Sequence, residues 1–164
     1  MKKLSVRPTD KDLENLVFSY SNMLFKLCFT MLGNNADAED AVSDVIVKYI
    51  TNSPAFTDEE HKKAWLIKVA TNICKDILRF NKRRNYINID DVQEYCKTNE
   101  SIDIVSDILQ LPEKYRSVIY LYYIEGYKTK DIANILSVSP QAVRKRLQYG
   151  RDMLKIEYGK DGEL

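Results

Sequence analysis

The sequence predicts an all-α protein made of two small helical domains joined by a linker. Three amphipathic stretches, with apolar residues three and four positions apart, fill its first half, and a helix-turn-helix pattern closes its second half. No stretch alternates apolar and polar residues between turn residues, so no strand is expected. The 164 residues suffice for one ordinary domain or two small ones, and a hydrophobic fraction of 45% allows real cores.

Three helices are expected in the first half. The first covers residues 10–32 and ends at Gly33, since glycine often closes a helix in the left-handed conformation. The second runs from residue 36 to about residue 50, and acidic residues in its first turn complement the helix dipole. The third runs from about residue 57 to residue 83. Together they predict a compact helical domain over residues 8–84.

An acidic segment without a sustained period follows at residues 85–103, and we interpret it as a partly ordered linker. The second domain is predicted over residues 104–158. A helix is expected to begin near Pro112 and to end at Gly126, because proline suits a first helical turn and glycine a helix end. The helix-turn-helix pattern comes next.

Residues 129–155 fit a helix-turn-helix, in which a short apolar helix, a tight connection and a second helix follow one another. Ser139 is a favourable N-cap and Pro140 a favourable first residue for that second helix. In this motif the second helix lies in the major groove, where arginine and lysine read guanine and glutamine reads adenine. The candidate DNA-contacting side chains are Gln141, Arg144, Lys145, Arg146, Gln148 and Tyr149. An ordinary helical hairpin with a solvated basic face would show the same spacing.

The net charge of +1 conceals an uneven distribution of charge along the chain. Residues 61–84 carry a net +7, residues 85–113 a net −6 and residues 114–158 a net +5. Two basic segments separated by an acidic one indicate two places where a polyanion is held. Solvated helix faces produce similar clusters, so the charges alone leave that alternative open.

The motifs that the sequence lacks exclude several classes of protein. It has no run of 18 apolar residues, so no membrane insertion is expected, and its basic N-terminal tip lacks the apolar stretch of a secretion signal. It contains no GxSxG, HExxH or CxxC motif and no glycine-rich nucleotide loop. We therefore expect a binding protein without metal or cofactor rather than an enzyme. Three widely separated cysteines favour reduced thiols and a cytoplasmic location.

Four stretches occur in an order and at separations that carry a family resemblance. The first stretch is DAEDAVSDV at residues 37–45, and the second is AWLIKVATN at residues 64–72 with DILR after it at residues 76–79. The third stretch carries Leu111, Pro112, Arg116, Val118 and Leu121. The fourth carries Gly126, Ile132, Ala133, the Val138-Ser139 turn and VRKRL at residues 143–147. Together they resemble conserved regions two and four of a bacterial sigma factor of the extracytoplasmic-function (ECF) type, in the sigma-70 family.

The resemblance implies a protein that joins core RNA polymerase and recognises promoter DNA in two pieces. The helix in region two would dock on the clamp coiled coil of the polymerase through Asp37, Asp40, Ser43, Asp44 and Lys48. The polymerase flap is a second implied contact. An anti-sigma factor is a further partner that the family implies.

The same resemblance implies the DNA-contacting residues. Asn72 would lie at the minus-ten element, where a base is flipped from the melted strand. Other implied contacts there are Phe56, Arg79, Lys82, Arg83 and Arg84. The minus-thirty-five element would be read by the helix-turn-helix side chains named above, while Lys128 and Lys130 contact the phosphate backbone.

The runner-up is a helix-turn-helix transcription regulator that is not a sigma factor, and it leaves the DAED and AWL motifs without a role. Two positions depart from the expected pattern. Ser137 stands where many such motifs have glycine. Gly150 lies in the middle of the second helix, where glycine costs about 1 kcal/mol relative to alanine, so a soft helix is expected there.

Overall fold

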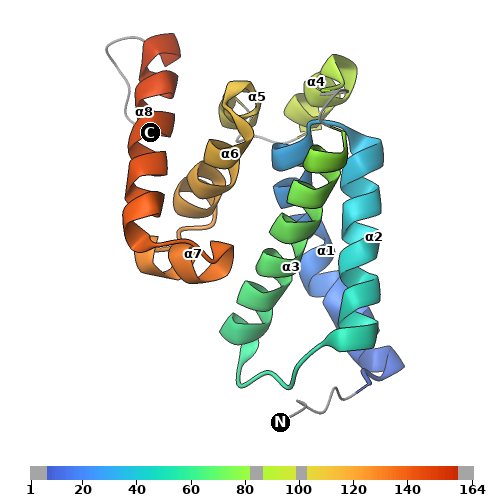
Figure 1. Ribbon diagram of the computed structural model, residues 1–164. Helices are drawn as coiled ribbons and strands as arrows, with labels where there is room; N and C mark the ends of the chain where they lie inside the picture. Colours follow the sequence, from blue (N-terminus) through green and yellow to red (C-terminus); the bar gives the residue numbers. More distant parts are fainter. Residues whose placement is uncertain (1–6, 82–86, 99–102, 159–164) are drawn as a thin grey trace.

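The computed structural model describes residues 7–81, 87–98 and 103–158, and within these residues every regular element is helical (Figure 1). The predicted all-α fold class is confirmed. In chain order the elements are α1 (Asp10–Leu32), α2 (Asn35–Asn52), α3 (Glu59–Phe80), α4 (Ile89–Thr98), α5 (Asp103–Gln110), α6 (Glu113–Ile119), the π-helical turn η1 (Tyr120–Ile124), α7 (Thr129–Leu136) and α8 (Pro140–Tyr158).

The first three helices pack against one another as a bundle, and each begins at a side-chain cap. Thr9 and Asp12 form a reciprocal capping box at the start of α1. Asn34 caps α2, and Asp58 caps α3 by accepting from the backbone N–H of His61 at 2.7 Å. The three helices expected from the apolar periodicity are therefore present.

Helix α4 forms inside the segment 85–103, where the sequence predicted only a partly ordered linker. A helix of this length is marginal in isolation, so its contacts with the bundle must stabilise it. The backbone N–H of Asn88 donates to the carbonyl of Gly33 at 3.0 Å. The ring of Tyr95 stacks on Phe29 with 4.6 Å between centroids. These contacts join residues far apart in the sequence, which explains why a local period did not predict the helix. The boundaries proposed for the domains stay a prediction.

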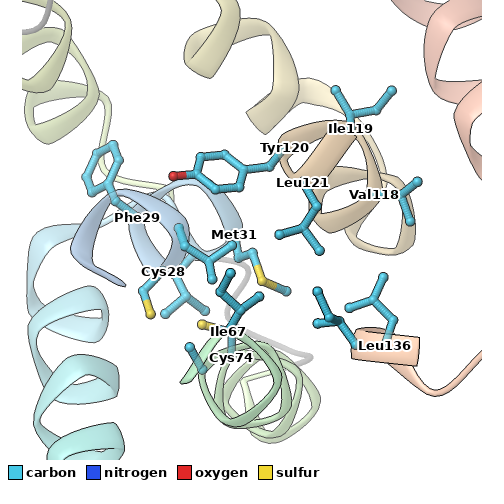
Figure 2. Close-up of a cluster of buried hydrophobic side chains, with 14 of the residues drawn as sticks. Cys28, Phe29, Met31, Ile67, Cys74, Val118, Ile119, Tyr120, Leu121 and Leu136 are labelled. Atoms are coloured by element: carbon cyan, nitrogen blue, oxygen red, sulfur yellow. The ribbon is translucent and has the colours of Figure 1, made fainter. Parts of the chain in front are cut away.

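The described helices share one buried core. Figure 2 shows Met31 of α1 and Ile67 of α3 beside Leu121 of η1 and Leu136 of α7, and all four are at most 4% exposed. Helix α1 contacts both α5 and α6, while α3 contacts α7. The second half of the chain therefore packs directly on the bundle made by the first half.

A buried arginine joins the two halves through backbone carbonyls. Arg116 is 4% exposed, and its guanidinium donates to the carbonyls of Met31 at 2.8 Å, Leu109 at 2.9 Å and Leu111 at 2.9 Å. Burial lowers the pKa of Arg116 from its usual value, and nearby Glu113 acts in the opposite direction. The three acceptors provide the hydrogen bonds that a buried charge requires.

Gly150 allows α8 to lie close to α6. A Cβ atom at this position would come within 2.8 Å of the side chain of Ile119, which is fully buried. Helix α8 runs through Gly150, from Pro140 to Tyr158, and the softness predicted there from the sequence stays a prediction. The missing side chain is thus a packing requirement at a helix crossing.

Replacing Arg116 with methionine is expected to lower the free energy of unfolding by about 3 kcal/mol or more. Three buried carbonyl oxygens would lose a charged donor, and leaving one such group unsatisfied costs roughly 1–3 kcal/mol. Urea denaturation followed by circular dichroism measures the change. Arg144→Met, at an exposed position of α8, is the matched control and should change stability little. Equal stabilities of the two variants would contradict the role given to Arg116.

Replacing Gly150 with alanine is expected to destabilise the protein, although alanine favours helix by about 1 kcal/mol. Overpacking against Ile119 should exceed that gain, since such strain typically costs about 1–3 kcal/mol. Thermal denaturation tests this in two backgrounds. In the Ile119→Ala background the same substitution should become stabilising, because the overlapping atoms are gone. A stabilising Gly150→Ala in the natural background would overturn the explanation.

Candidate nucleic-acid interface

The helix-turn-helix is held by a short, fully bonded connection between α7 and α8. Ser137 adopts the left-handed conformation at φ 55°, the one described non-glycine residue with positive φ. Its neighbour Val138 donates its backbone N–H to the carbonyl of Ala133 at 3.0 Å. The hydroxyl of Ser139 accepts from the backbone N–H of Ala142 at 3.0 Å and so caps α8. These bonds fix the direction in which α8 leaves the turn.

The predicted minus-thirty-five contacts do not all share one face. Gln141, Arg144, Lys145, Gln148 and Tyr149 are exposed on α8, and Lys128 and Lys130 are exposed near the start of α7. Arg146 is half-buried and faces a pocket beside Lys75 of α3. Consecutive helical residues point in different directions, so the basic triplet is divided between solvent and the junction with α3.

Asn72, the residue expected to lie at the minus-ten element, is exposed on α3. Arg79 lies farther along the same helix and forms an ion pair with Asp76 at 3.8 Å. Both of these charged side chains are more than 70% exposed, so the pair leaves the guanidinium available to a ligand. Lys82, Arg83 and Arg84, which the sequence also predicted there, lie outside the described residues.

Phe56 belongs to an aromatic cluster at the start of α3. Its ring lies 5.7 Å from Trp65 and 6.3 Å from Tyr49, measured between centroids, and 5.4 Å from the ring of His61. Phe56 and Trp65 are half-buried, while Tyr49 is buried. Only the outer part of this cluster can therefore meet a nucleic acid.

The α2 residues predicted to bind the polymerase separate into two groups. Asp40, Ser43, Asp44 and Lys48 are exposed along the helix. Asp37 is half-buried and its carboxylate accepts from the side-chain amide of Asn34 at 3.0 Å. Asp37 thus stabilises the start of α2, in agreement with the dipole argument made from the sequence.

Two protein-family models match the parts of the chain that contain these residues. The family models described as Sigma-70 region 2 and Sigma-70 region 4 match residues 16–84 and residues 106–154. The chain belongs to the sigma-70 family. The matched spans include α2, α3 and the helix-turn-helix, in the order that the sequence motifs predicted. The protein is thus an ECF-type sigma factor, a promoter-recognising factor of transcription initiation.

Curated relatives match this sigma factor over most of their length. The chain is 29% identical over 171 residues to the ECF RNA polymerase sigma factor SigW of Bacillus subtilis, covering 92% of this chain and 91% of SigW. It is 24% identical to the RNA polymerase sigma factor SigV of the same organism, covering 91% of this chain and 92% of SigV.

Two solved structures share the fold. The sigma factor RpoE, crystallised in complex with the anti-sigma factor NepR from Bartonella quintana, matches with a TM-score of 0.69 and 19% identity over 89% of this chain and 96% of RpoE. CnrH in complex with the cytosolic domain of CnrY matches with a TM-score of 0.68 and 21% identity over 94% of this chain and 92% of CnrH. No described helix of this sigma factor is long and apolar enough to cross a membrane.

Sequence reasoning missed two cations of the sigma factor that the fold brings beside predicted DNA contacts. Lys75 of α3 and Lys114 of α6 line the same pocket as Arg79 and Arg146. Burial lowers the pKa of Lys75, and the charges of Arg146 and Arg79 lower it further. No motif marks Lys75 or Lys114, because their proximity depends on how α6 and α8 pack on α3.

Replacing Ser137 with glycine is expected to raise the free energy of unfolding by roughly 0.5–1 kcal/mol. Glycine removes the strain of the left-handed conformation, and part of that gain is lost to greater freedom of the unfolded chain. Ser139→Gly is the matched control and should lose a few tenths of a kcal/mol by weakening the cap. Chemical denaturation of both variants measures the two opposite signs. A destabilised Ser137→Gly protein would be inconsistent with a strained turn.

Proposed function

We propose that this sigma factor reads the upstream promoter element with the exposed basic start of α8. The observation that carries the proposal is the exposure of Arg144 and Lys145 on the second helix of a capped helix-turn-helix, inside the region 4 match. Arginine and lysine in this position reach guanine edges in the major groove. Gln141, Gln148 and Tyr149 are exposed on the same helix and extend the contact surface.

The minus-ten element is assigned to α3 in this proposal. Asn72 is exposed within the region 2 match, and an exposed amide can hydrogen-bond to the edge of a flipped base. Arg79 would hold the phosphate backbone nearby, and Phe56 would contact the element with its accessible edge. Asn72 is exposed whereas Phe56 is half-buried, which supports Asn72 rather than Phe56 as the base contact.

Core RNA polymerase is assigned to the exposed face of α2. Asp40, Asp44 and Lys48 are exposed there, and Asp37 contributes indirectly by holding the start of the helix. The clamp coiled coil is the proposed docking site for this face, and the flap is the proposed site for the region 4 helices. The protein would act in the cytoplasm as a binding factor without enzymatic activity or cofactor.

An anti-sigma factor is the remaining partner in this proposal. RpoE, which shares the fold, was crystallised in complex with the anti-sigma factor NepR, and CnrH, which also shares it, was solved in complex with the cytosolic domain of CnrY. A bound protein that covers the exposed start of α8 or the α2 face would block the contacts proposed above.

Reconstituted transcription with core polymerase and no other sigma factor tests the function. Initiation from one defined start site on a cognate promoter is the expected result. DNA binding without initiation would contradict the proposal and indicate a regulator that does not act as a sigma factor.

Replacing Arg144 with alanine is expected to weaken binding to the upstream element by about 1–3 kcal/mol, since a base contact of this size is lost. The loss should be confined to templates that keep the natural upstream element. Lys130→Ala, a proposed backbone contact, should instead weaken binding to all sequences by a similar factor. Competition binding of the holoenzyme to matched and scrambled promoters measures both. A uniform loss for Arg144→Ala would make it a phosphate contact only.

A further inference from the structure

A pocket of about 300 Å³ lies at the junction of the two halves of the chain, apart from the exposed start of α8. Its lining comes from α1, α3, α6 and α8, and consists of Met31, Lys75, Leu78, Arg79, Glu113, Lys114, Ser117 and Arg146. This volume suits a small ligand rather than a folded partner. The pocket exists only while α8 and α6 lie beside α3.

The lining of this pocket is strongly basic. Four of its side chains are cationic and come from three different helices, whereas Glu113 is its one carboxylate. Among the residues that the structure describes, no carboxylate lies within 4 Å of the charged nitrogens of Lys75, Lys114 or Arg146. Asp76, which pairs with Arg79, and Glu113 offset part of this charge, and Lys75, Lys114 and Arg146 are the cations without a carboxylate at ion-pair distance among the described residues.

This charge opposes the packing that creates it. Lys75 and Arg79 of α3 line the same pocket as Arg146 of α8, so like charges of the two helices face one another. In keeping with this, the pKa of Lys75 is lowered by burial first and then by Arg146 and Arg79. Arg146 is half-buried, so water screens this repulsion less than at a fully exposed site. A bound anion would replace the repulsion with attraction.

We propose that this junction pocket binds a small ligand carrying a diphosphate group, the chemistry of inorganic pyrophosphate and nucleoside diphosphates. Lysine ammonium groups act as point charges for phosphate, and arginine donates two parallel hydrogen bonds to its oxygens. The hydroxyl of Ser117, a buried residue, supplies a further polar group in the lining. The several negative charges of a diphosphate match cations on three helices better than the single charge of one phosphodiester.

Such a ligand links the two halves of the sigma factor. It binds only when α3 and α8 are together, so by mass action it stabilises that arrangement against any opened form. It also occupies Arg146, which then cannot contact DNA. Binding of the diphosphate and use of Arg146 at a promoter are therefore mutually exclusive. The pocket shares Arg79 with the proposed minus-ten contacts, but the inference rests on the geometry of the junction and not on any DNA contact.

Isothermal titration of the full chain with inorganic pyrophosphate, at fixed ionic strength and without divalent metal, tests the site. The expected result is saturable binding of one pyrophosphate per chain. Lys75→Gln and Arg146→Gln should each weaken it at least tenfold. Lys11→Gln removes one exposed lysine from α1, outside the pocket, and should leave the affinity unchanged. No detectable binding, or an equal loss in all three variants, would overturn the proposal.

Two further measurements separate a built site from other sources of phosphate binding. Dimethyl phosphate carries one charge and represents the DNA backbone. It should bind at least tenfold more weakly than pyrophosphate, and equal affinity would make the pocket a DNA contact and contradict the proposal.

The second measurement uses Lys75→Glu, which places a carboxylate against Arg146. Without ligand, this variant should have a higher melting temperature than the natural protein. Pyrophosphate should raise the melting temperature of the natural protein but not that of the variant. A lowered melting temperature together with retained pyrophosphate binding would contradict the assigned charges.

Discussion

The buried guanidinium of Arg116 sets the geometry on which the rest of the structure depends. A charge at 4% exposure is tolerable only when its donors are bonded, and the acceptors here are backbone carbonyls of α1, α5 and the α5–α6 turn. Backbone acceptors fix helix positions more strictly than flexible side chains would. The end of α1 and the start of α6 are consequently held together, and the shared core around Met31 and Leu121 can close (Figure 2).

The junction between the halves combines two opposing interactions. Apolar burial draws α6 and α7 onto the bundle, and Lys63 of α3 adds an ion pair with Glu125 at 3.2 Å. The cations around Lys75 and Arg146 act against this attraction. The stability of the packing between the two halves should therefore change when a ligand or substitution changes the charge at the junction. The stability of a purely apolar junction would change only with its packing. If the pocket binds a diphosphate as proposed, that ligand and promoter DNA would compete for Arg146.

Much of the fold could be predicted from the sequence because helix formation is largely local. The spacing of apolar residues predicted α1, α2 and α3, and the serine-proline pair predicted the start of α8. The exposed part of the candidate site could also be predicted from the sequence, because Arg144 and Lys145 lie on a recognisable helix-turn-helix. The promoter-contacting roles predicted for single residues came from the resemblance of the motifs to the family. The structure adds which of those side chains are exposed.

The sequence by itself determined the helical class, the Ser139 cap, the turn and the resemblance to the family. Tertiary structure decided that α4 is a helix, that Gly150 is a close contact with Ile119, and that Arg146 faces Lys75. Each of these features joins residues distant in the sequence, across helix crossings that no single-helix period encodes. Periodicity identifies the buried face of a helix, but which helix covers that face depends on the packing of the whole chain.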